Sequence, residues 1–595
     1  MRALLFLVSA VAAASGLVGA LRWFLAARAG NWGETGDGLL FWLQWAGDPG
    51  GDRLLYAAAL ALALLLLAAL LRRRPAGRWL GSLLRLGGHP FVALGLVLFA
   101  LLPQGVTALL RPAPDPEAPS VVLVVLDSVR LDEMGWGGAE HPTTPHLDRL
   151  AEEGVAFTQA ITQAPWTKPS AATLLTGLIP GRHLAIGRPS LGLYSALEGR
   201  HRTLAEAFLA AGWETCALST NPNITARFGF RQGFQRFRDD AREDADWLLG
   251  EARAWLGERD RERPFFLYLH LNDTHYPYAA PEPWRGAFYD GPSQAVLDGS
   301  TEAEFRALDP DGGFLREFSA EDARQFRLSQ MEELRAVDER LGPFLEEVFT
   351  GERPVIAVIV SDHGEEFLEH GDLGHGHQVY DELLRVPLQV AWNEEAGRRL
   401  GLRRGRWNTQ VRLLDVAPTV LELCDLGWPE RAAPLDGESL VPFLRDEADP
   451  QAHRPAWSET DHYGSLRSGP TGPLRTWRMP GEKIITTDPW VLEEAWKGRY
   501  WVFDLGADPE ERRNLAGEKE RRLRLLQAME ASGWLLPRPE PIPYRLLLTG
   551  GGAAAGGGEA LSQMGYVDAA VDPSKPPVFA PGAVPWWPPW VPAGG

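Results

Sequence analysis

Cysteine and an excess of basic charge are what this sequence lacks. Its 595 residues contain two cysteines, Cys216 and Cys424, and 59 basic against 78 acidic side chains, for a net charge of −19. Both cysteines lie in apolar stretches, which predicts buried free thiols, and no Cys/His cluster has the spacing of a zinc finger. Because the phosphate backbone of nucleic acid binds basic surfaces, this composition argues against nucleic acid as a partner.

The charge is also unevenly distributed along the chain. Residues 1–118 contain ten arginines and six acids, so the remainder carries a net charge of −23. A length of 595 residues predicts about two to four domains. An anionic substrate of so acidic a domain has to be held by a local site, most simply one that contains a metal ion.

Three apolar segments at the N-terminus predict a membrane anchor. Residues 3–21, 54–71 and 90–110 each approach the roughly 20 residues that span a bilayer. The first segment is alternatively a cleaved signal peptide. Five arginines between the second and third segments predict a cytoplasmic loop there. We therefore expect a multi-pass protein of the cytoplasmic (inner) membrane, with a Pro-rich spacer at 111–119 and everything after Arg111 outside the cytoplasm.

The middle of the chain reads as an α/β domain with a mostly parallel central sheet flanked by helices. Strands are expected at 120–127, 213–219, 264–272 and 354–361, and helices at 144–153, 203–211 and 331–348. Polar residues follow directly on four of the strands. Ligands of such sheets bind at the carboxyl ends of the strands, so we expect one shared site; the residues concerned are Asp127, Asn221, Asp273 with His275, and Asp362 with His363.

Asp127, Asp362 and His363 form a ligand set suited to a divalent cation such as Mn, Mg, Ca or Zn. The alternative is that these acids orient a helix or pair with arginine. The stretch "APWTKPSAATLLTG", residues 164–177, adds a helix that starts at the site, with Pro169 in its first turn. A metal ion would orient the hydroxyl of Thr167 and lower its pKa, which would make it a nucleophile.

Several further side chains are candidates for substrate contacts. Lys168 either binds an anionic oxygen and protonates a leaving group or is a solvated lysine, and Ser170 is interpreted as a helix-start residue. Asn221 and His375 are predicted to bind substrate, and His275 and His377 to act in catalysis, since histidine suits general acid work. His370 is a fourth histidine of this kind, and glycines around His375 and His377 predict a tight loop.

The segments "VVLDSVRLDEMGWGG", "TKPSAATLLTGLIPGRH", "HLNDTHYPY" and "SDHGEEFLEHGDLGHGHQVYDELLRVPL" resemble, in order and spacing, a sulfatase-like member of the alkaline phosphatase superfamily. The resemblance extends over residues 119–515. It implies a catalytic domain at 120–445, a smaller C-terminal α+β subdomain at 446–545, and metal-assisted transfer of a sulfuryl or phosphoryl group through a covalent enzyme intermediate. Residues 546–595 form a Gly/Pro-rich tail, whose Trp586, Trp587 and Trp590 contact either a membrane interface or the protein itself.

The sequence departs from the formylglycine-dependent members of this family at four places. The C-x-P-S-R element reads Thr167 to Ala171, and threonine is not converted to formylglycine by the known route. The paired acids after the first strand, the Asp-Asn pair and the Gly-Lys-x-His element are replaced by Asp127-Ser128, Asp362-His363 and Thr220 to Asn223. What remains resembles the Thr-nucleophile branch, which includes membrane-anchored phosphoglycerol and phosphoethanolamine transferases and phosphodiesterases.

Within that branch the resemblance implies that Asp127, Thr167, Asp362 and His363 hold one divalent metal ion. A second metal, on Asp273, His275, His375 and His377, is the less favoured expectation. The sequence therefore predicts a membrane-anchored hydrolase or transferase of phosphoesters, whose substrate belongs to a lipid or an envelope glycan. The alternatives are a sulfuric ester hydrolase that uses unmodified Thr167, and a non-catalytic, membrane-tethered binding protein.

Overall fold

The structure, a computed structural model, describes residues 114–115, 117–186, 195–289, 319–351, 353–428, 432–460, 474–486 and 500–532. Nearly all of them belong to one compact unit, formed by Asp115–Leu209 and Trp213–Gly595. The three predicted membrane segments and the Gly/Pro-rich tail lie outside the described residues. Within the described ranges, no helix combines the length and the apolar character needed to cross a bilayer.

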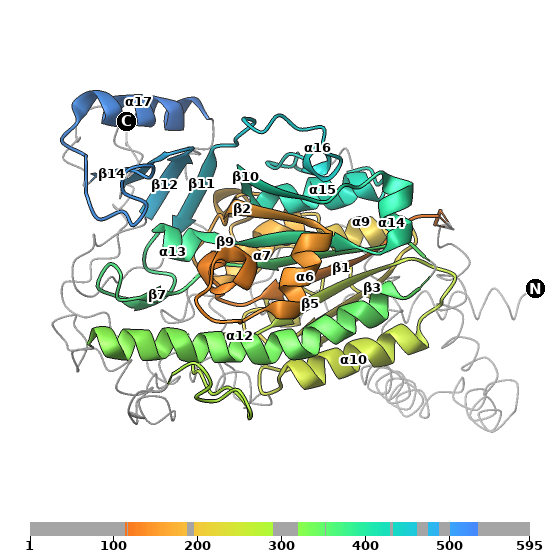
Figure 1. Ribbon diagram of the computed structural model, residues 1–595. Coiled ribbons are helices and arrows are strands. Elements are labelled where there is room, and N and C mark those ends of the chain that lie inside the picture. The colour runs from red at the N-terminus through yellow and green to blue at the C-terminus, as the bar shows by residue number, and fades with distance from the viewer. Residues whose placement is uncertain are drawn as a thin grey trace, which may run out of the picture. The chain divides into compact units, whose positions relative to one another are not determined.

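An eight-stranded sheet forms the centre of this unit (Figure 1). Its order is β10-β2-β9-β6-β1-β5-β3-β4, and β9 alone runs antiparallel to its neighbours. The strands are β1 (Ser120–Leu126), β2 (Val155–Ile161), β3 (Glu214–Ser219), β4 (Arg236–Asp239), β5 (Phe265–Leu271), β6 (Val355–Ser361), β9 (Arg385–Trp392) and β10 (Gly405–Arg412). The expected mostly parallel sheet is confirmed, whereas β2, β4, β9 and β10 were not anticipated from the sequence.

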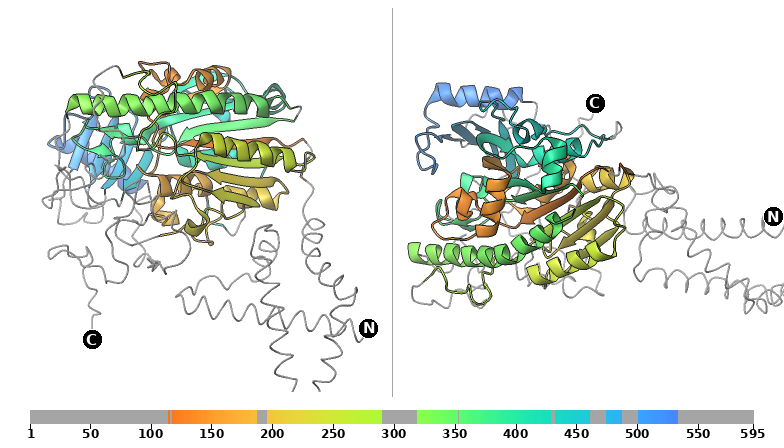
Figure 2. Two further views of the ribbon diagram at one scale, coloured as in Figure 1. Left: turned by 90° about the horizontal axis from the view of Figure 1, so that it is seen from below. Right: turned by 45° about the vertical axis from the view of Figure 1, so that its right-hand side comes forward.

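The central strands are apolar because helices cover both faces of the sheet. All seven residues of β1, β5 and β6 are buried, as expected for parallel strands in the middle of an α/β sheet. One face packs against α6 (Pro145–Glu153), α10 (Ala245–Glu258) and α12 (Ala320–Phe349) in a single hydrophobic core. Figure 2 shows α10 and α12 side by side across that face.

On the other side of the sheet, Figure 1 shows α14 (Glu394–Leu400), α15 (Val416–Leu423) and α16 (Val441–Leu444). The remaining helices of this part are α7 (Thr167–Thr176), α8 (Pro180–His183), α9 (Leu204–Ala210) and α13 (Asp381–Leu384). Both cysteines are buried free thiols, as predicted. The expected helices at 144–153 and 203–211 are confirmed, and the one at 331–348 extends to 30 residues as α12.

A second, four-stranded antiparallel sheet follows the main one in sequence. It contains β11 (Ala456–Thr460), β12 (Leu474–Met479), β13 (Glu482–Thr486) and β14 (Tyr500–Asp504), and α17 (Lys519–Ala531) packs on one face of it. The other face meets the main sheet and α13 through a small apolar cluster that includes Ile161, Leu384 and Phe503. The predicted α+β character of the C-terminal part is therefore seen, with its first strand beginning at Ala456.

Candidate active site

Four polar side chains meet at the carboxyl ends of neighbouring central strands. Asp127 follows β1, Asp362 and His363 follow β6, and His270 is the last residue but one of β5. All four are fully buried. The imidazole Nε2 of His363 lies 3.5 Å from Asp127 Oδ1 and 3.6 Å from Asp362 Oδ2, and His270 Nε2 lies 3.1 Å from Asp127 Oδ2. Strand order explains the meeting, because β1 lies between β5 and β6.

Helix α7 brings Thr167 to the same place. Thr167 is its first residue, fully buried, with Oγ1 3.3 Å from His363 Nε2. The helix is fixed to the strand ends by Ser170, whose hydroxyl donates to the carbonyl of Asp362 at 2.6 Å. Gly177 ends the helix with a φ of 63°, a left-handed conformation that glycine adopts without strain. Ser170 thus has the structural part that the sequence predicted for it.

Two sharp turns position the acids. Ser128 adopts a φ of 60°, and its hydroxyl donates to Asp127 Oδ1 at 2.9 Å. Beyond His363, Gly364 passes so close to α13 that a β-carbon would lie 1.9 Å from the carbonyl oxygen of Glu382. Any larger residue at 364 would displace the Asp362-His363 segment, which is why a glycine follows this pair.

The carboxylates lie too close together to be ionised independently. Burial raises the pKa of Asp362 well above its usual range, and the negative charge of Asp127 raises it further. Burial also acts to raise the pKa of Asp127, but its hydrogen bond with His270 and its electrostatic interactions with the surrounding histidines hold it below its usual range. Two buried acids whose pKa values are pushed apart are typical of functional sites.

The donor set of this cluster fits a divalent metal ion. Asp362 Oδ1 accepts hydrogen bonds from the backbone N–H groups of Ser128 and His363, whereas its buried Oδ2 has no hydrogen-bond partner. A buried carboxylate oxygen left without a partner is costly in a native fold. The ligand atoms of Asp127, His270 and Asp362 lie within 4.8 Å of one another, and carboxylate oxygens with imidazole nitrogens suit Mg, Mn or Zn.

The two imidazoles are oriented as metal-binding histidines are. His363 Nδ1 lies 2.9 Å from the carbonyl of Gly364, so Nδ1 carries the proton and Nε2 presents a lone pair to the acids. Burial lowers the pKa of His363 to about 3. His270 Nδ1 is paired with the hydroxyl of Tyr268 at 2.8 Å. His270 was missed from the sequence; the signal was a polar residue inside an apolar strand, two positions after Tyr268 on the same strand face.

Two further histidines lie beside the cluster. The His375 ring is centred 4.3 Å from that of His363 and 4.9 Å from that of His275. His375 Nδ1 pairs with the buried Glu365 at 2.9 Å, and Glu365 also accepts from Tyr278 at 3.2 Å. Burial lowers the pKa of His275 and lowers that of His375 to about 4. Both predicted histidines are therefore brought to the site as neutral side chains.

The other sequence candidates have different surroundings from those expected. Asn221 donates to Asp127 and to Asn272, and its oxygen accepts from the Asn223 backbone, so its amide holds Asp127 in place rather than facing a substrate. Asp273 accepts from the Ala245 backbone at the start of α10 and is an N-terminal helix partner. The prediction that Asp273 belongs to the shared site is therefore wrong, because its carboxylate turns toward the helix.

His377 and His370 are engaged within the loop that carries them. His377 Nε2 lies 3.2 Å from Glu366, and its Nδ1 lies 3.2 Å from the carbonyl of His375. His370 pairs with Glu382 and stacks on Tyr380. These contacts favour a structural role for His377, in stabilising its loop, over the predicted catalytic role. Of the four residues suggested for a second metal, His275 and His375 are neighbours, but Asp273 and His377 are engaged elsewhere. The second ligand cluster of the described residues is Glu366, His370 and Glu382.

Lys168 is not the solvated lysine that the alternative interpretation supposed. It is fully buried, and its ammonium nitrogen lies 3.8 Å from the centre of the Phe228 ring. Burial, with the nearby charge of Arg227, lowers its pKa to about 7. A lysine with this pKa can exchange a proton near neutral pH, which keeps the predicted acid role chemically available.

Comparison with known proteins agrees with this geometry. The family model described as Sulfatase matches residues 119–426, more than half of the chain. The chain belongs to the sulfatase family. Among its relatives is an ulvan-active sulfatase of Formosa agariphila, 24% identical over 68% of this chain and 78% of that protein. Another is the multifunctional alkaline phosphatase superfamily protein PehA of Trinickia caryophylli, 24% identical over 67% of this chain and 91% of that one.

Solved structures agree on the fold. The phosphonate monoester hydrolase of Agrobacterium radiobacter superposes with a TM-score of 0.55 at 22% identity, over 69% of this chain and 94% of that one. This sulfatase-family protein is therefore a hydrolase with homologues in the alkaline phosphatase superfamily. Enzymes of the family use a metal ion, and the buried cluster of Asp127, His270 and Asp362 is a fitting place for one.

Proposed function

We propose that this protein is a metal-dependent hydrolase of phosphoesters in which Thr167 is the nucleophile. The observation that carries the proposal is the placement of the Thr167 hydroxyl, 3.3 Å from His363 Nε2 and at the start of a helix, beside two buried acids. The helix start adds a positive dipole end, which favours a tetrahedral anion at the same place.

The residues around the hydroxyl have separate tasks in this proposal. Asp127, His270, Asp362 and His363 would hold a divalent ion, which supplies positive charge to the ester oxygens and lowers the pKa of a neighbouring hydroxyl. Asn221 and Ser170 position this cluster through Asp127 and the Asp362 carbonyl. His275 and His375, neutral and beside the cluster, are placed to hydrogen-bond the substrate.

The proposed reaction has two steps. In the first, Thr167 Oγ1 forms a bond to the phosphorus, the bond from phosphorus to the ester oxygen breaks, and the alcohol leaves. The hydroxyl proton lost by Thr167 balances the proton gained by the departing alcohol. In the second step water attacks the phosphorus, which restores the Thr167 hydroxyl and releases the phosphate.

The second candidate is a sulfatase that uses Thr167 unmodified. The ulvan-active sulfatase of Formosa agariphila, similar over 68% of this chain, favours that candidate. The position occupied by Thr167 favours the phosphoester, since threonine offers neither the thiol nor the primary hydroxyl from which the formylglycine of sulfatases is made. We further propose that the apolar segments at 3–21, 54–71 and 90–110 anchor the protein in the cytoplasmic membrane, with the catalytic domain outside the cytoplasm.

The test compares wild type with Thr167→Ala, Thr167→Ser and, as a matched control, Thr176→Ala. Thr176 is a buried threonine at the far end of the same helix, where its hydroxyl donates to the carbonyl of Ala172. Each variant is assayed with added Mn, Mg, Ca or Zn on a bis-aryl phosphate, an aryl phosphate and an aryl sulfate. We expect Thr167→Ala to lose activity about a thousandfold or more, and Thr167→Ser and Thr176→Ala to keep a measurable part of it.

Two results would contradict this proposal. Full metal-dependent activity in Thr167→Ala would remove the nucleophile assignment. A wild-type preference for the aryl sulfate would replace the phosphoester by the second candidate. Mass spectrometry of acid-quenched enzyme adds a direct observation, because the covalent intermediate increases the mass of the peptide with Thr167 by one phosphoryl, aryl phosphoryl or sulfuryl group, according to the substrate.

A further inference from the structure

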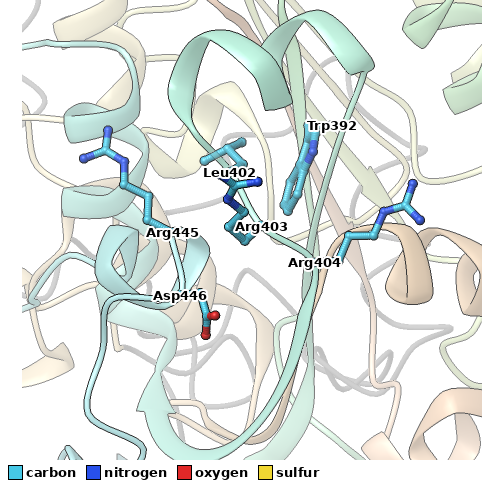
Figure 3. A pocket seen from close by; sticks show the side chains of 6 residues that line it. All are labelled: Trp392, Leu402, Arg403, Arg404, Arg445 and Asp446. Carbon is cyan, nitrogen blue, oxygen red and sulfur yellow. The ribbon is translucent and has the colours of Figure 1, made fainter.

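A hollow lined by arginines lies at the amino ends of strands of the main sheet, an edge opposite the one that carries the candidate active site. Its volume is about 530 Å³. Figure 3 shows Arg403 in the middle of the hollow, with Arg404 and Arg445 extending to either side. The residues that line it are Trp392, Leu402, Arg403, Arg404, Arg445 and Asp446.

Strand direction places this hollow at the amino ends of the parallel strands. Arg403 and Arg404 come directly before β10, whose first residue pairs with the first residue of β2. Trp392 ends the antiparallel strand β9 beside the start of β6. The metal cluster instead follows the carboxyl ends of β1 and β6. Because β1 has seven residues and a strand rises about 3.3 Å per residue, roughly 20 Å separate the two edges.

The segment around the start of β10 is locally basic, although Asp446, which lines the hollow, and Glu447 follow Arg445. Residues 394–406 contain five arginines and two glutamates, in a protein with a net charge of −19. Arg403 and Arg404 are exposed. In the part of the chain that the structure describes, no carboxylate lies within ion-pair distance of Arg403, Arg404 or Arg445. We call Arg398, Arg399, Arg403, Arg404 and Arg445 the arginine edge.

The linker enters the domain at the arginine edge. Glu117, in the linker before β1, forms an ion pair with Arg399 of α14. Nine residues, 111–119, separate the third apolar segment from the first residue of β1. An extended chain spans at most about 3.6 Å per residue, so this linker covers about 30 Å at most. An anchored third segment would therefore keep the arginine edge close to the bilayer.

We propose that the arginine edge docks on the anionic headgroups of the membrane in which the chain is anchored. The proposal rests on the membrane anchor of the proposed function and not on its chemistry. Guanidinium groups bind phosphate in a bidentate manner, and each arginine near an anionic bilayer strengthens attachment about fivefold. Arg403 and Arg404, exposed and without an ion-pair partner among the described residues, are the groups of this edge that such a surface attracts.

Docking in this way also selects among substrates. The candidate active site lies at the opposite edge of the sheet, so it faces away from the bilayer, roughly 20 Å beyond the arginine edge. Esters of lipid headgroups in the same membrane are then out of reach. The substrate class that fits is an ester on a soluble molecule or on a glycan that extends from the membrane.

Arginine modification tests the proposal on the full chain. The protein is placed in nanodiscs of phosphatidylcholine alone or with about 40% phosphatidylglycerol, treated briefly with phenylglyoxal, and digested for mass spectrometry. Arg512 and Arg513, an exposed adjacent pair in the C-terminal part, serve as the internal control. We expect modification of Arg403 and Arg404 to fall about fivefold or more in the anionic discs, with Arg512 and Arg513 unchanged. High salt should remove the protection, because it screens exposed charges.

Equal modification of Arg403 and Arg404 in both kinds of disc would overturn the proposal. An Arg403→Gln/Arg404→Gln variant should lose the anionic protection of Arg445, which an Arg512→Gln/Arg513→Gln variant should keep. If the proposed membrane anchor is wrong, the full chain should purify without detergent, which distinguishes that outcome from a failure of docking. Vesicles of the same two compositions are then added to the soluble protein, and unchanged modification of Arg403 and Arg404 again overturns the docking. Activity on soluble aryl esters plays no part in either outcome.

Discussion

Two buried clusters of charged side chains in this protein differ in their balance of acidic and basic groups. The candidate metal cluster brings together two carboxylates, Asp127 and Asp362, with the imidazoles of His270 and His363. The second cluster joins Asp381 of α13 to Arg478 of β12 and Lys483 of β13, at 2.8 and 3.0 Å, and Lys483 to Glu511 at 2.9 Å. It contains two acids and two cations, so its charges cancel within the protein.

The difference indicates what each cluster is for. Burial acts to raise the pKa of Asp381, but Arg478 and Lys483 hold it below the usual range, whereas Asp362 has its pKa raised by burial and by another acid. A balanced cluster needs nothing from outside and fastens the small sheet to the main domain. An unbalanced one leaves negative charge that either a proton on Asp362 or an added cation neutralises. Imbalance, rather than burial, therefore marks the functional site.

The largest expected effect concerns activity. Asp362→Asn should reduce turnover about a thousandfold or more, since it removes a proposed metal ligand. The folded state without metal should become more stable by on the order of 1 kcal/mol, because like charges are no longer opposed. Steady-state kinetics and urea unfolding in a chelator measure the two quantities. A destabilised Asp362→Asn protein would mean that this carboxylate is paired like Asp381.

Asp381→Asn is the matched change in the balanced cluster. It leaves Arg478 and Lys483 short of a partner in a buried place, so the free energy of unfolding should fall by about 3–5 kcal/mol. Turnover per folded molecule at low temperature should stay within a few-fold of wild type. Unfolding curves with activity measured at matched folded fractions check this. Unchanged stability would show that the charges do not depend on each other.

Metal should affect the two clusters differently. At a hundred times the dissociation constant, an ion bound only to the folded state stabilises it by about 2.7 kcal/mol. We expect the wild type to show such a thermal shift, Asp362→Asn to lose it, and Asp381→Asn to keep it on its lower baseline. Calorimetric scans with chelator and with each cation measure the shifts. A full shift in Asp362→Asn would place the ion elsewhere.

The smallest expected effects distinguish the roles of His375 and His377, the two histidines of one loop. Burial acts to lower the pKa of His377, but Glu366 and Asp372 raise it to about 9. The stability that His377 contributes is thus complete below pH 6.5 and lost as the pH rises through 9, by about 1–3 kcal/mol. His377→Gln should remove that part of the pH dependence and keep most activity, whereas His375→Gln should lower kcat/KM about tenfold or more.

Unfolding curves between pH 6 and 10 and kinetics at one pH provide both readouts for these variants. A His377→Gln protein that kept the full pH dependence would assign the titration to another group. A larger activity loss in His377→Gln than in His375→Gln would restore the catalytic role that the sequence predicted for His377.

The residue pattern predicted those parts of the site in which polar residues directly follow apolar strands. Asp127, Asp362 and His363 were expected together because apolar strands of one parallel sheet end at one edge, and they meet there. His270 was not expected, since it lies inside its strand rather than after it. Asp273 was expected wrongly, because position after a strand does not determine which way a carboxylate turns; the free N–H groups of α10 attracted it instead.

By itself the sequence determined the family, the central strands and the identity of the side chain at the start of α7, since these depend on local order and hydrophobic pattern. Only the tertiary structure decided which polar groups hydrogen-bond to one another. Asn221 holds Asp127, and His377 holds its loop, whereas Asp362 keeps an oxygen without a hydrogen bond. Such pairing joins residues far apart in sequence, and the physical reason is that every buried polar group takes whichever partner the packing brings within reach.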